Sequence, residues 1–124
     1  MDALKIKGSL NTFEVSLDAA TGKLLFTGRS YPENSSVFFH PIIEWLQRYV
    51  QNPAAQTECT FEIEYFNSAS RKCIIEIFRI LESLHKTNGS VTVIWNYEDG
   101  DEGMKETGEE YKNLCKLNFR FNAL

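Results

Sequence analysis

The hydrophobic period changes abruptly in the middle of the chain, and this change constrains the fold more than any other feature of the sequence. From Thr60 to Phe66, apolar Phe61, Ile63 and Tyr65 alternate with glutamates, which is the period of a strand with one buried face. Apolar residues then recur every three or four positions, which predicts an amphipathic helix; they are Ile74, Ile77, Phe78, Leu81 and Leu84. We therefore expect a strand that ends near Phe66 and a helix that follows it directly.

The same two periods predict the other elements of the chain. In chain order, we expect a short edge strand within residues 1–9, a hairpin over residues 12–28, a helix over residues 38–50, the strand and helix described above, a strand over residues 91–97, a helix over residues 101–114 and a last short strand over residues 117–121. This order predicts one α/β domain over residues 1–124, with a mixed β-sheet in which an N-terminal hairpin is followed by β-α-β-α-β-α units.

Turn and cap residues mark the expected helix ends. Ser30 and Glu33 have the spacing of a capping box for the first helix, and Pro41 predicts a kink or a second start within it. The second helix should run to about Lys86 and close at Asn88-Gly89, because both residue types tolerate the left-handed conformation.

The junction between the central strand and its helix is suited to binding an anion. Asn67, Ser68 and Ser70 have short side chains that accept hydrogen bonds from free helix amides, and capping alone would explain them. However, Arg71 and Lys72 fall in the first turn, where the helix dipole disfavours cations. Amides, hydroxyls and cations together fit a phosphate, a carboxylate of a partner, or a phosphate attached to one of the serines.

Three loops should meet at one edge of the predicted sheet. Strand-helix-strand units place strands parallel, and their carboxyl ends then lie along a common edge, where α/β proteins usually have their sites. The loops are Tyr31 to Ser35, Asn67 to Ser70 and Tyr97 to Glu102. We therefore expect hydroxyls, two cations and a carboxylate cluster to converge on one face.

Composition excludes several classes of protein. With 43% apolar and 13% aromatic residues, 124 residues can form a packed core. A net charge of −4 argues against a nucleic-acid partner and against binding to an anionic membrane. No apolar run approaches the roughly 20 residues of a membrane-spanning helix, and residues 1–10 lack a signal-peptide core, so we expect a cytoplasmic protein without membrane insertion.

Candidate catalytic groups are few. His40 and His85 fall in helical patterns without evident partners, and Cys59 and Cys73 fall on buried faces. Three cysteines without a CxxC spacing indicate reduced thiols. The acidic run from Glu98 to Glu102 lacks the later glutamate of a calcium loop, and a solvated turn explains it better. We therefore predict no catalytic residue, no metal, no cofactor and no enzymatic activity.

Five short motifs stand in order along the chain. They are Ser30-Tyr31-Pro32-Glu33-Asn34-Ser35, Trp45-Leu46, Tyr65-Phe66-Asn67-Ser68-Ala69-Ser70-Arg71-Lys72, Trp95-Asn96-Tyr97-Glu98-Asp99 and Gly108-Glu109-Glu110. Over nearly the whole chain, their order and spacing resemble the SiaC family of bacterial regulatory phosphoproteins. The element order also resembles anti-anti-sigma (STAS) domains, in which a phosphorylatable serine starts the helix after a central strand, so the predicted fold is STAS-like.

The resemblance implies a non-enzymatic switch in cyclic-di-GMP signalling and biofilm regulation. In the family, the hydroxyl residue directly after the asparagine of the third motif is phosphorylated by a serine/threonine protein kinase, and a metal-dependent serine/threonine phosphatase reverses this. The unphosphorylated form binds and activates a diguanylate cyclase. That position is Ser68 here; the family also uses threonine, and either hydroxyl accepts phosphate. Ser70 is the second choice, because Ala69 stands where the motif commonly has another hydroxyl.

The resemblance and the common loop edge together predict a partner-binding surface. Its expected residues are Tyr31, Pro32, Glu33, Asn34, Ser35, Asn67, Ser70, Arg71, Lys72, Tyr97, Glu98 and Asp99. Two other functions use the same helix start. One is an anti-anti-sigma-like regulator that switches between protein partners, and the other is a module that binds a nucleotide or another small anion through Arg71 and Lys72. An enzyme would need a nucleophile and a base in contact, which the sequence does not indicate.

Overall fold

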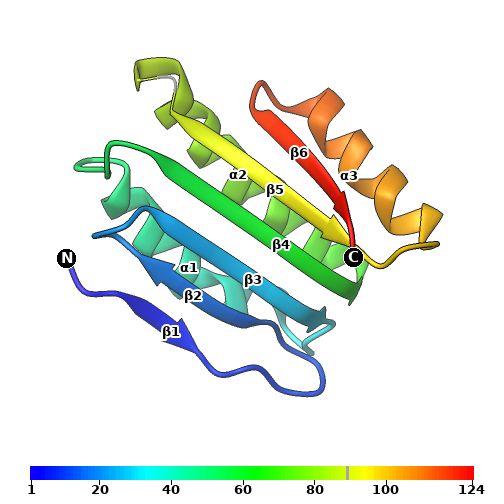
Figure 1. Ribbon diagram of the computed structural model, residues 1–124. Coiled ribbons are helices and arrows are strands. Elements are labelled where there is room, and N and C mark those ends of the chain that lie inside the picture. Colours follow the sequence, from blue (N-terminus) through cyan, green and yellow to red (C-terminus); the bar gives the residue numbers. More distant parts are fainter. Residues whose placement is uncertain (89) are drawn as a thin grey trace.

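The structure is a computed structural model that describes residues 1–88 and 90–124. Within these residues it contains one six-stranded sheet and three helices (Figure 1). In chain order, the elements are β1 (Leu4–Ile6), β2 (Glu14–Asp18), β3 (Lys23–Ser30), α1 (Ser35–Tyr49), β4 (Thr57–Phe66), α2 (Ser68–Asn88), β5 (Val91–Tyr97), α3 (Glu102–Leu114) and β6 (Asn118–Ala123). The predicted α/β class and element order are confirmed, whereas the expected role of Gly89 in closing α2 lies outside the described residues.

The sheet is mixed, and its strands follow chain order from β1 at one edge to β6 at the other. β1, β2 and β3 are antiparallel neighbours, so the predicted hairpin is present as β2 and β3. Its turn requires glycine, because Gly22 has a φ of 72° and a Cβ there would lie 2.1 Å from the carbonyl oxygen of Gln56. From β3 to β6 every neighbouring pair is parallel, as expected for strand-helix-strand units.

The three helices pack against one face of the sheet and leave the other face uncovered (Figure 1). From β3 to β6, each new parallel strand lies on the same side of the previous one, and strand-helix-strand crossovers are right-handed. The connecting helices therefore all lie on the same face of the sheet. The core lies between these layers. At its centre, the Phe61 ring lies 4.8 Å from Phe26, 5.4 Å from Phe78 of α2 and 5.5 Å from Trp95, measured between ring centroids. Polar strand residues such as Glu62 therefore point toward the uncovered face.

A bulge interrupts the pairing of β3 with β4. Gly28 pairs with Ile63, but the next residue, Arg29, pairs with Tyr65, so Glu64 is an extra residue on β4. Gly28 has a backbone φ of 100°, which residues other than glycine rarely adopt. A bulge of this kind reverses the alternation of side chains on the longer strand.

The bulge exposes one aromatic side chain and buries its neighbour. Tyr65 is 52% exposed, whereas Phe66 turns inward and stacks on Tyr111 of α3 with ring centroids 6.4 Å apart. The prediction that Tyr65 shares the buried face of Phe61 and Ile63 is therefore wrong. The alternation of residues 60–66 does not reveal the extra residue, because a bulge depends on the partner strand.

The start of α1 also differs from the prediction. Ser30 is the buried last residue of β3, and Asn34 caps the helix by accepting a hydrogen bond from the Val37 amide at 3.3 Å. The expected capping box of Ser30 and Glu33 is therefore wrong. α1 runs unbroken through Pro41, so the expected alternative of a second start is absent. The proline leaves the Val37 carbonyl without its helical donor, and water can replace that donor because Val37 is 69% exposed.

Glu82 of α2 holds the connection between α3 and β6. The residue is 9% exposed. Its carboxylate accepts a hydrogen bond from the Lys116 amide and pairs with Arg79 at 3.4 Å. The Lys116 amide first, and then the charge of Arg79, lower the pKa of the Glu82 carboxyl below its ordinary value of 4.5. This carboxylate therefore stabilises the fold at neutral pH.

Glu82→Gln is expected to lower the free energy of unfolding at pH 7 by about 1–3 kcal/mol, because a charged acceptor is replaced by a neutral one. A depressed folded-state pKa makes the contribution complete above pH 4.5 and removes it as pH falls through that pKa. Urea denaturation of both proteins from pH 7 downward should therefore show their difference shrinking in acid. Glu109→Gln, at an exposed position of α3, is the control, and a pH-independent difference for Glu82→Gln would contradict the assignment.

Candidate functional site

The three predicted loops do lie at the same end of the sheet, beyond the carboxyl ends of β3, β4 and β5 (Figure 1). Two of them are in contact, because the Ser35 and Ser70 hydroxyls lie 3.4 Å apart, and the Asn67 amide donates to the carbonyl oxygen of Ser30 at the end of β3 at 3.0 Å. The third loop is joined to the end of the chain, since the Asp99 amide donates to the Leu124 carbonyl at 3.2 Å. The candidate site is therefore built on this end of the fold.

Asn67 is the cap of α2. Its side-chain oxygen accepts a hydrogen bond from the Ser70 amide at 2.9 Å, and its carbonyl oxygen accepts one from the Arg71 amide at 2.9 Å. Ser68 is the first residue of the helix and its side chain is exposed. The capping role is thus filled by Asn67, which leaves the Ser68 hydroxyl at the surface beside the positive end of the helix dipole.

Ser70 belongs to a buried cluster of three serines. Its hydroxyl lies 2.7 Å from that of Ser30 and 3.4 Å from that of Ser35, and it donates to the Ser30 carbonyl at 3.1 Å. Ser70 and Ser30 are fully buried, and Ser35 is 6% exposed. The cluster ties the end of β3 to the starts of α1 and α2. Ser35 and Ser70 are therefore shielded from solvent in this structure, whereas Ser68 is exposed.

The two cations of the first turn of α2 face different neighbours. Arg71 pairs with Glu110 of α3 at 3.1 Å, and its guanidinium carbon lies 5.5 Å from the centre of the Phe66 ring. The Tyr111 hydroxyl also donates to the Arg71 carbonyl at 3.2 Å. Arg71 therefore links α2 to α3. Lys72 instead faces a groove between the starts of α1 and α2.

The groove between α1 and α2 contains the candidate phosphorylation site. Its lining residues are Glu33, Asn34, Ser35, Ser36, Ser68, Ala69, Lys72, Cys73 and Glu76. Lys72 follows Ser68 by four positions, so both side chains lie on the same side of the helix. Within this groove, Lys72 is the cation placed to meet a negative charge on Ser68.

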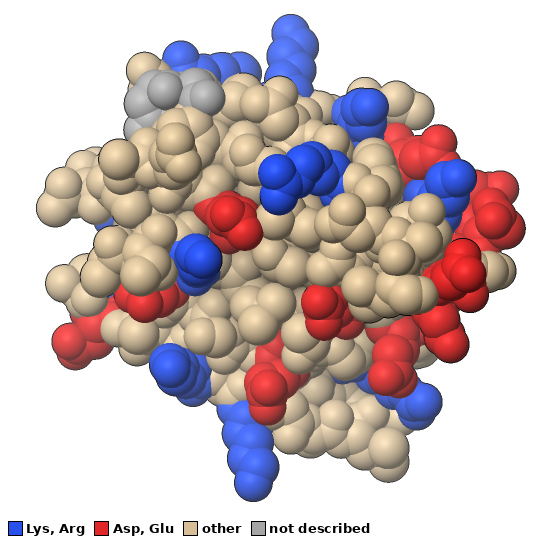
Figure 2. Space-filling model, in the orientation of Figure 1, with Lys and Arg blue, Asp and Glu red and all other residues tan. Residues whose placement is uncertain are grey.

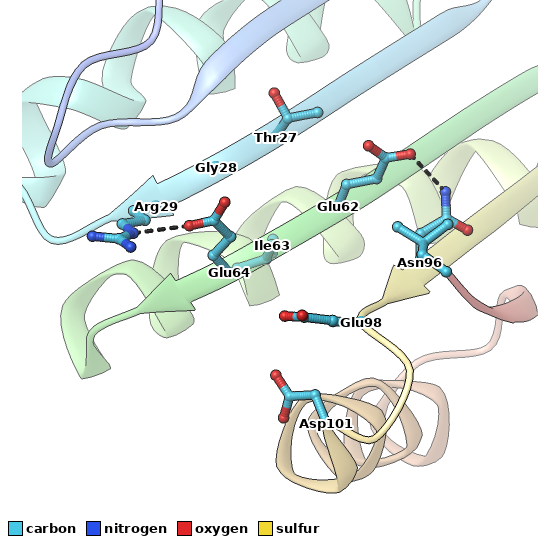
Figure 3. A pocket seen from close by; sticks show the side chains of 10 residues that line it. Thr27, Gly28, Arg29, Glu62, Ile63, Glu64, Asn96, Glu98 and Asp101 are labelled. Atoms are coloured by element: carbon cyan, nitrogen blue, oxygen red, sulfur yellow. Dashed lines mark hydrogen bonds and ion pairs between the residues drawn. The ribbon is translucent and has the colours of Figure 1, made fainter.

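The acidic turn, Tyr97 to Glu102, faces the opposite side of the sheet from the groove. Glu98 and Asp101 line a hollow on the uncovered face, together with Thr27, Gly28, Arg29, Glu62, Ile63, Glu64, Asn96 and Leu124 (Figure 3). Asp101 also caps α3 by accepting a hydrogen bond from the Met104 amide at 3.0 Å. The hollow and the groove share no lining residue. The expectation that hydroxyls, cations and carboxylates converge on one face is therefore wrong, because both helices of the groove lie behind the sheet.

The remaining predicted residues lie at the surface of this end. Glu33, Asn34, Glu98 and Asp99 are exposed, while Tyr31, Pro32 and Tyr97 are half-buried. Sequence reasoning missed most residues of the hollow. The alternating glutamates of β4 predict carboxylates on one face of the strand, but only the one-sided placement of the helices shows that this face is uncovered.

The structure offers little for thiol chemistry. Burial raises the pKa of the thiols of Cys59, Cys73 and Cys115, whereas a nucleophilic thiol needs a lowered pKa. Cys59 is buried as predicted, but Cys73 is half-buried. His40 lies 3.5 Å from Glu44, one helical turn away in α1. His85 of α2 accepts a hydrogen bond from the amide of Val91, the first residue of β5, so it links the helix to the next strand. None of the described helices combines the length and apolar character needed to cross a membrane.

Comparisons with known proteins agree on one family. A family model described as "SiaC family regulatory phosphoprotein" matches residues 6–124. An uncharacterised protein of Pseudomonas aeruginosa (strain UCBPP-PA14) is 31% identical over 123 residues, which are 99% of this chain and 98% of that protein.

Solved structures of SiaC match over the whole fold. The crystal structure of apo-SiaC from Pseudomonas aeruginosa matches with a TM-score of 0.90 and 30% identity, over 99% of this chain and all of that chain. A chain in the crystal structure of the diguanylate cyclase SiaD in complex with its activator SiaC, from the same organism, matches with a TM-score of 0.91 and 30% identity, over 98% of this chain and 99% of that chain.

Proposed function

Because the chain belongs to the SiaC family of regulatory phosphoproteins, we propose that its unphosphorylated form binds and activates a diguanylate cyclase, and that phosphorylation of Ser68 ends this interaction. SiaC of Pseudomonas aeruginosa forms a complex with the diguanylate cyclase SiaD as its activator. The match covers almost the full length of both chains. The protein itself is then a binding partner in the cytoplasm and carries out no reaction.

The exposure of Ser68 is the observation that carries the regulatory part of the proposal. Of the two predicted acceptors, Ser68 is exposed and Ser70 is fully buried, while Ser36, another exposed serine of the groove, lies outside the family motif. A kinase must reach its acceptor hydroxyl from solvent. Of the two predicted acceptors, Ser68 alone offers that access, and it stands in the position of the family motif.

Phosphate on Ser68 should leave the fold intact. It adds about 1.5 to 2 negative charges and three acceptor oxygens beside the amino end of a helix, where negative charge is favourable. Lys72 lies on the same side of the helix. Arg71 would have to leave Glu110 in order to contribute, so we assign the first contact to Lys72.

The same charge opposes a docked partner. A protein surface packed against the start of α2 would have to accommodate a hydrated dianion. A coupling of about 1–3 kcal/mol changes affinity by roughly 5- to 150-fold, which is enough for a switch. A serine/threonine kinase and a metal-dependent serine/threonine phosphatase would set the fraction of protein able to bind.

The proposal predicts that Ser68→Ala gives a permanently active protein. Purified wild-type and variant proteins should bind the diguanylate cyclase of the same organism with equal affinity and raise its cyclic-di-GMP synthesis equally. In the native host, a phosphopeptide map should show phosphate on the wild-type peptide containing Ser68 and none on the variant peptide. If the wild-type protein neither binds the cyclase nor changes its rate of cyclic-di-GMP synthesis, the proposed function is refuted. If the peptide containing Ser68 is well covered in the map but carries no phosphate in any growth state, regulation by phosphorylation of Ser68 is refuted.

A further inference from the structure

We propose that the partner interface extends onto the uncovered face of the sheet, where the bulge of β4 presents a tyrosine pair, exposed Tyr65 and half-buried Tyr31, beside the acidic hollow. The geometry fits a segment of the cyclase that carries an apolar side chain next to an arginine or lysine. This inference rests on the proposed function, because it takes the diguanylate cyclase as the partner.

The tyrosine pair has the properties of an interface anchor. The ring centroids of Tyr31 and Tyr65 lie 5.8 Å apart with an interplanar angle of 65°, an edge-to-face contact that restricts both rings. Tyr65 is 52% exposed, and the Tyr31 amide is held by the carbonyl oxygen of Asn11 at 2.9 Å. Large, ordered and exposed aromatic side chains are the commonest hot spots of protein interfaces.

The bulge is the cause of this exposure. If β4 continued through Glu64 as a regular strand without a bulge, its alternation would direct Tyr65 toward the helices, like Phe61 and Ile63. Bulges commonly re-aim side chains next to functional sites. Gly28, which pairs with Ile63 just before the bulge, lines the acidic hollow, and a Cβ there would have open space around it.

The hollow determines the charge of the partner. Its lining residues include four carboxylates, from Glu62, Glu64, Glu98 and Asp101, and one cation, Arg29. Arg29 is already paired with Glu64 at 2.9 Å, so the negative charge is in excess (Figure 3). Figure 2 views the uncovered face and shows acidic side chains gathered toward the end of the sheet where β4 and β5 finish. Charge complementarity therefore selects a cationic side chain from the partner.

The tyrosine pair is also continuous with the phosphorylation site. Tyr65 lies three positions before Ser68, and Asn67 between them caps α2 and bonds to the end of β3. A partner segment that covers Tyr65 therefore approaches the start of α2, where phosphate on Ser68 would meet it. The anchor and the switch are parts of one surface that wraps around the end of the sheet.

The test measures the dissociation constant between the purified protein and the diguanylate cyclase of its host. Tyr65→Ala should weaken binding by about tenfold or more, as expected for an interface anchor. Glu98→Lys should weaken it about fivefold or more, with an effect that diminishes as salt is raised. The controls are Leu114→Ala, at a position also 52% exposed, and Glu106→Lys, on the exposed side of α3; both should bind within about twofold of wild type.

The outcomes separate the inference from the function on which it rests. If all four variants keep their melting temperatures and wild type binds, equal binding by Tyr65→Ala overturns the inference and leaves the proposed function standing. If Glu98→Lys binds the cyclase as tightly as wild type, the inference that the partner contributes a cationic side chain is overturned. A wild-type protein that does not bind the cyclase overturns the proposed function, and the inference with it.

Discussion

Phe61→Ala is expected to lower the free energy of unfolding by about 3–5 kcal/mol. Phe61 is fully buried in the central strand β4 and contacts aromatic rings of β3, α2 and β5. The parallel pairing of β4 with β3 and β5 keeps these neighbours in place, so the structure cannot collapse into the space left by the ring. This loss is a large part of the roughly 5–15 kcal/mol that stabilises a domain of ordinary size.

Urea denaturation followed by circular dichroism would measure the effect. The matched control is Leu25→Ala, a strand substitution on the uncovered face at a residue that is 38% exposed, for which we expect a loss of less than about 1 kcal/mol. Similar losses at the two positions would contradict the one-sided arrangement of the helices, because both faces of the sheet would then be equally packed.

Much of the fold could be predicted because its signals are local. The period of two in residues 60–66 and the period of three to four in residues 74–84 depend on side chains that are neighbours in the chain, and both elements are present. The parallel order then follows from the alternation of strands and helices. The likeness to STAS domains rests on element order alone and stays a prediction.

Two of the errors concern contacts between residues that are distant in sequence. The bulge that exposes Tyr65 depends on pairing with Gly28 and Arg29, more than 30 residues earlier. The cluster that buries Ser70 involves Ser30, at a separation of 40 residues. Periodicity within one segment carries no information about such partners.

The candidate site shows the same division. A cap among Asn67, Ser68 and Ser70 could be predicted from the sequence because capping at a helix start is a local property, and Asn67 is the residue that caps α2. Ser68 was chosen through the resemblance to the family motif, and its phosphorylation stays a prediction. Which cation faces Ser68 could not be identified, because Arg71 is drawn away by Glu110, 39 residues later. The acidic hollow was missed for a related reason, since its lining combines β3, β4, β5 and the following turn.

Ser68→Asp is expected to weaken binding of the diguanylate cyclase by up to about 100-fold while leaving the protein as stable as wild type or slightly more so. The two effects have opposite signs for a physical reason. A carboxylate at the first position of α2 interacts favourably with the helix dipole, by about 0.3–1 kcal/mol, but it places a charge where the partner docks. Isothermal titration with the cyclase and thermal denaturation of the free variant would measure both.

Ser83→Asp is the matched control for this substitution. Ser83 is an exposed serine of the same helix, 15 residues further on, which corresponds to about 22 Å along the helix axis. The Ser83→Asp variant should bind the cyclase like wild type, because its added charge lies far from the edge of the sheet that carries Tyr65 and Lys72. Loss of binding by both variants would indicate a general effect of negative charge on α2. Unchanged binding by Ser68→Asp, together with unchanged binding by the enzymatically phosphorylated protein, would show that the start of α2 is not part of the interface.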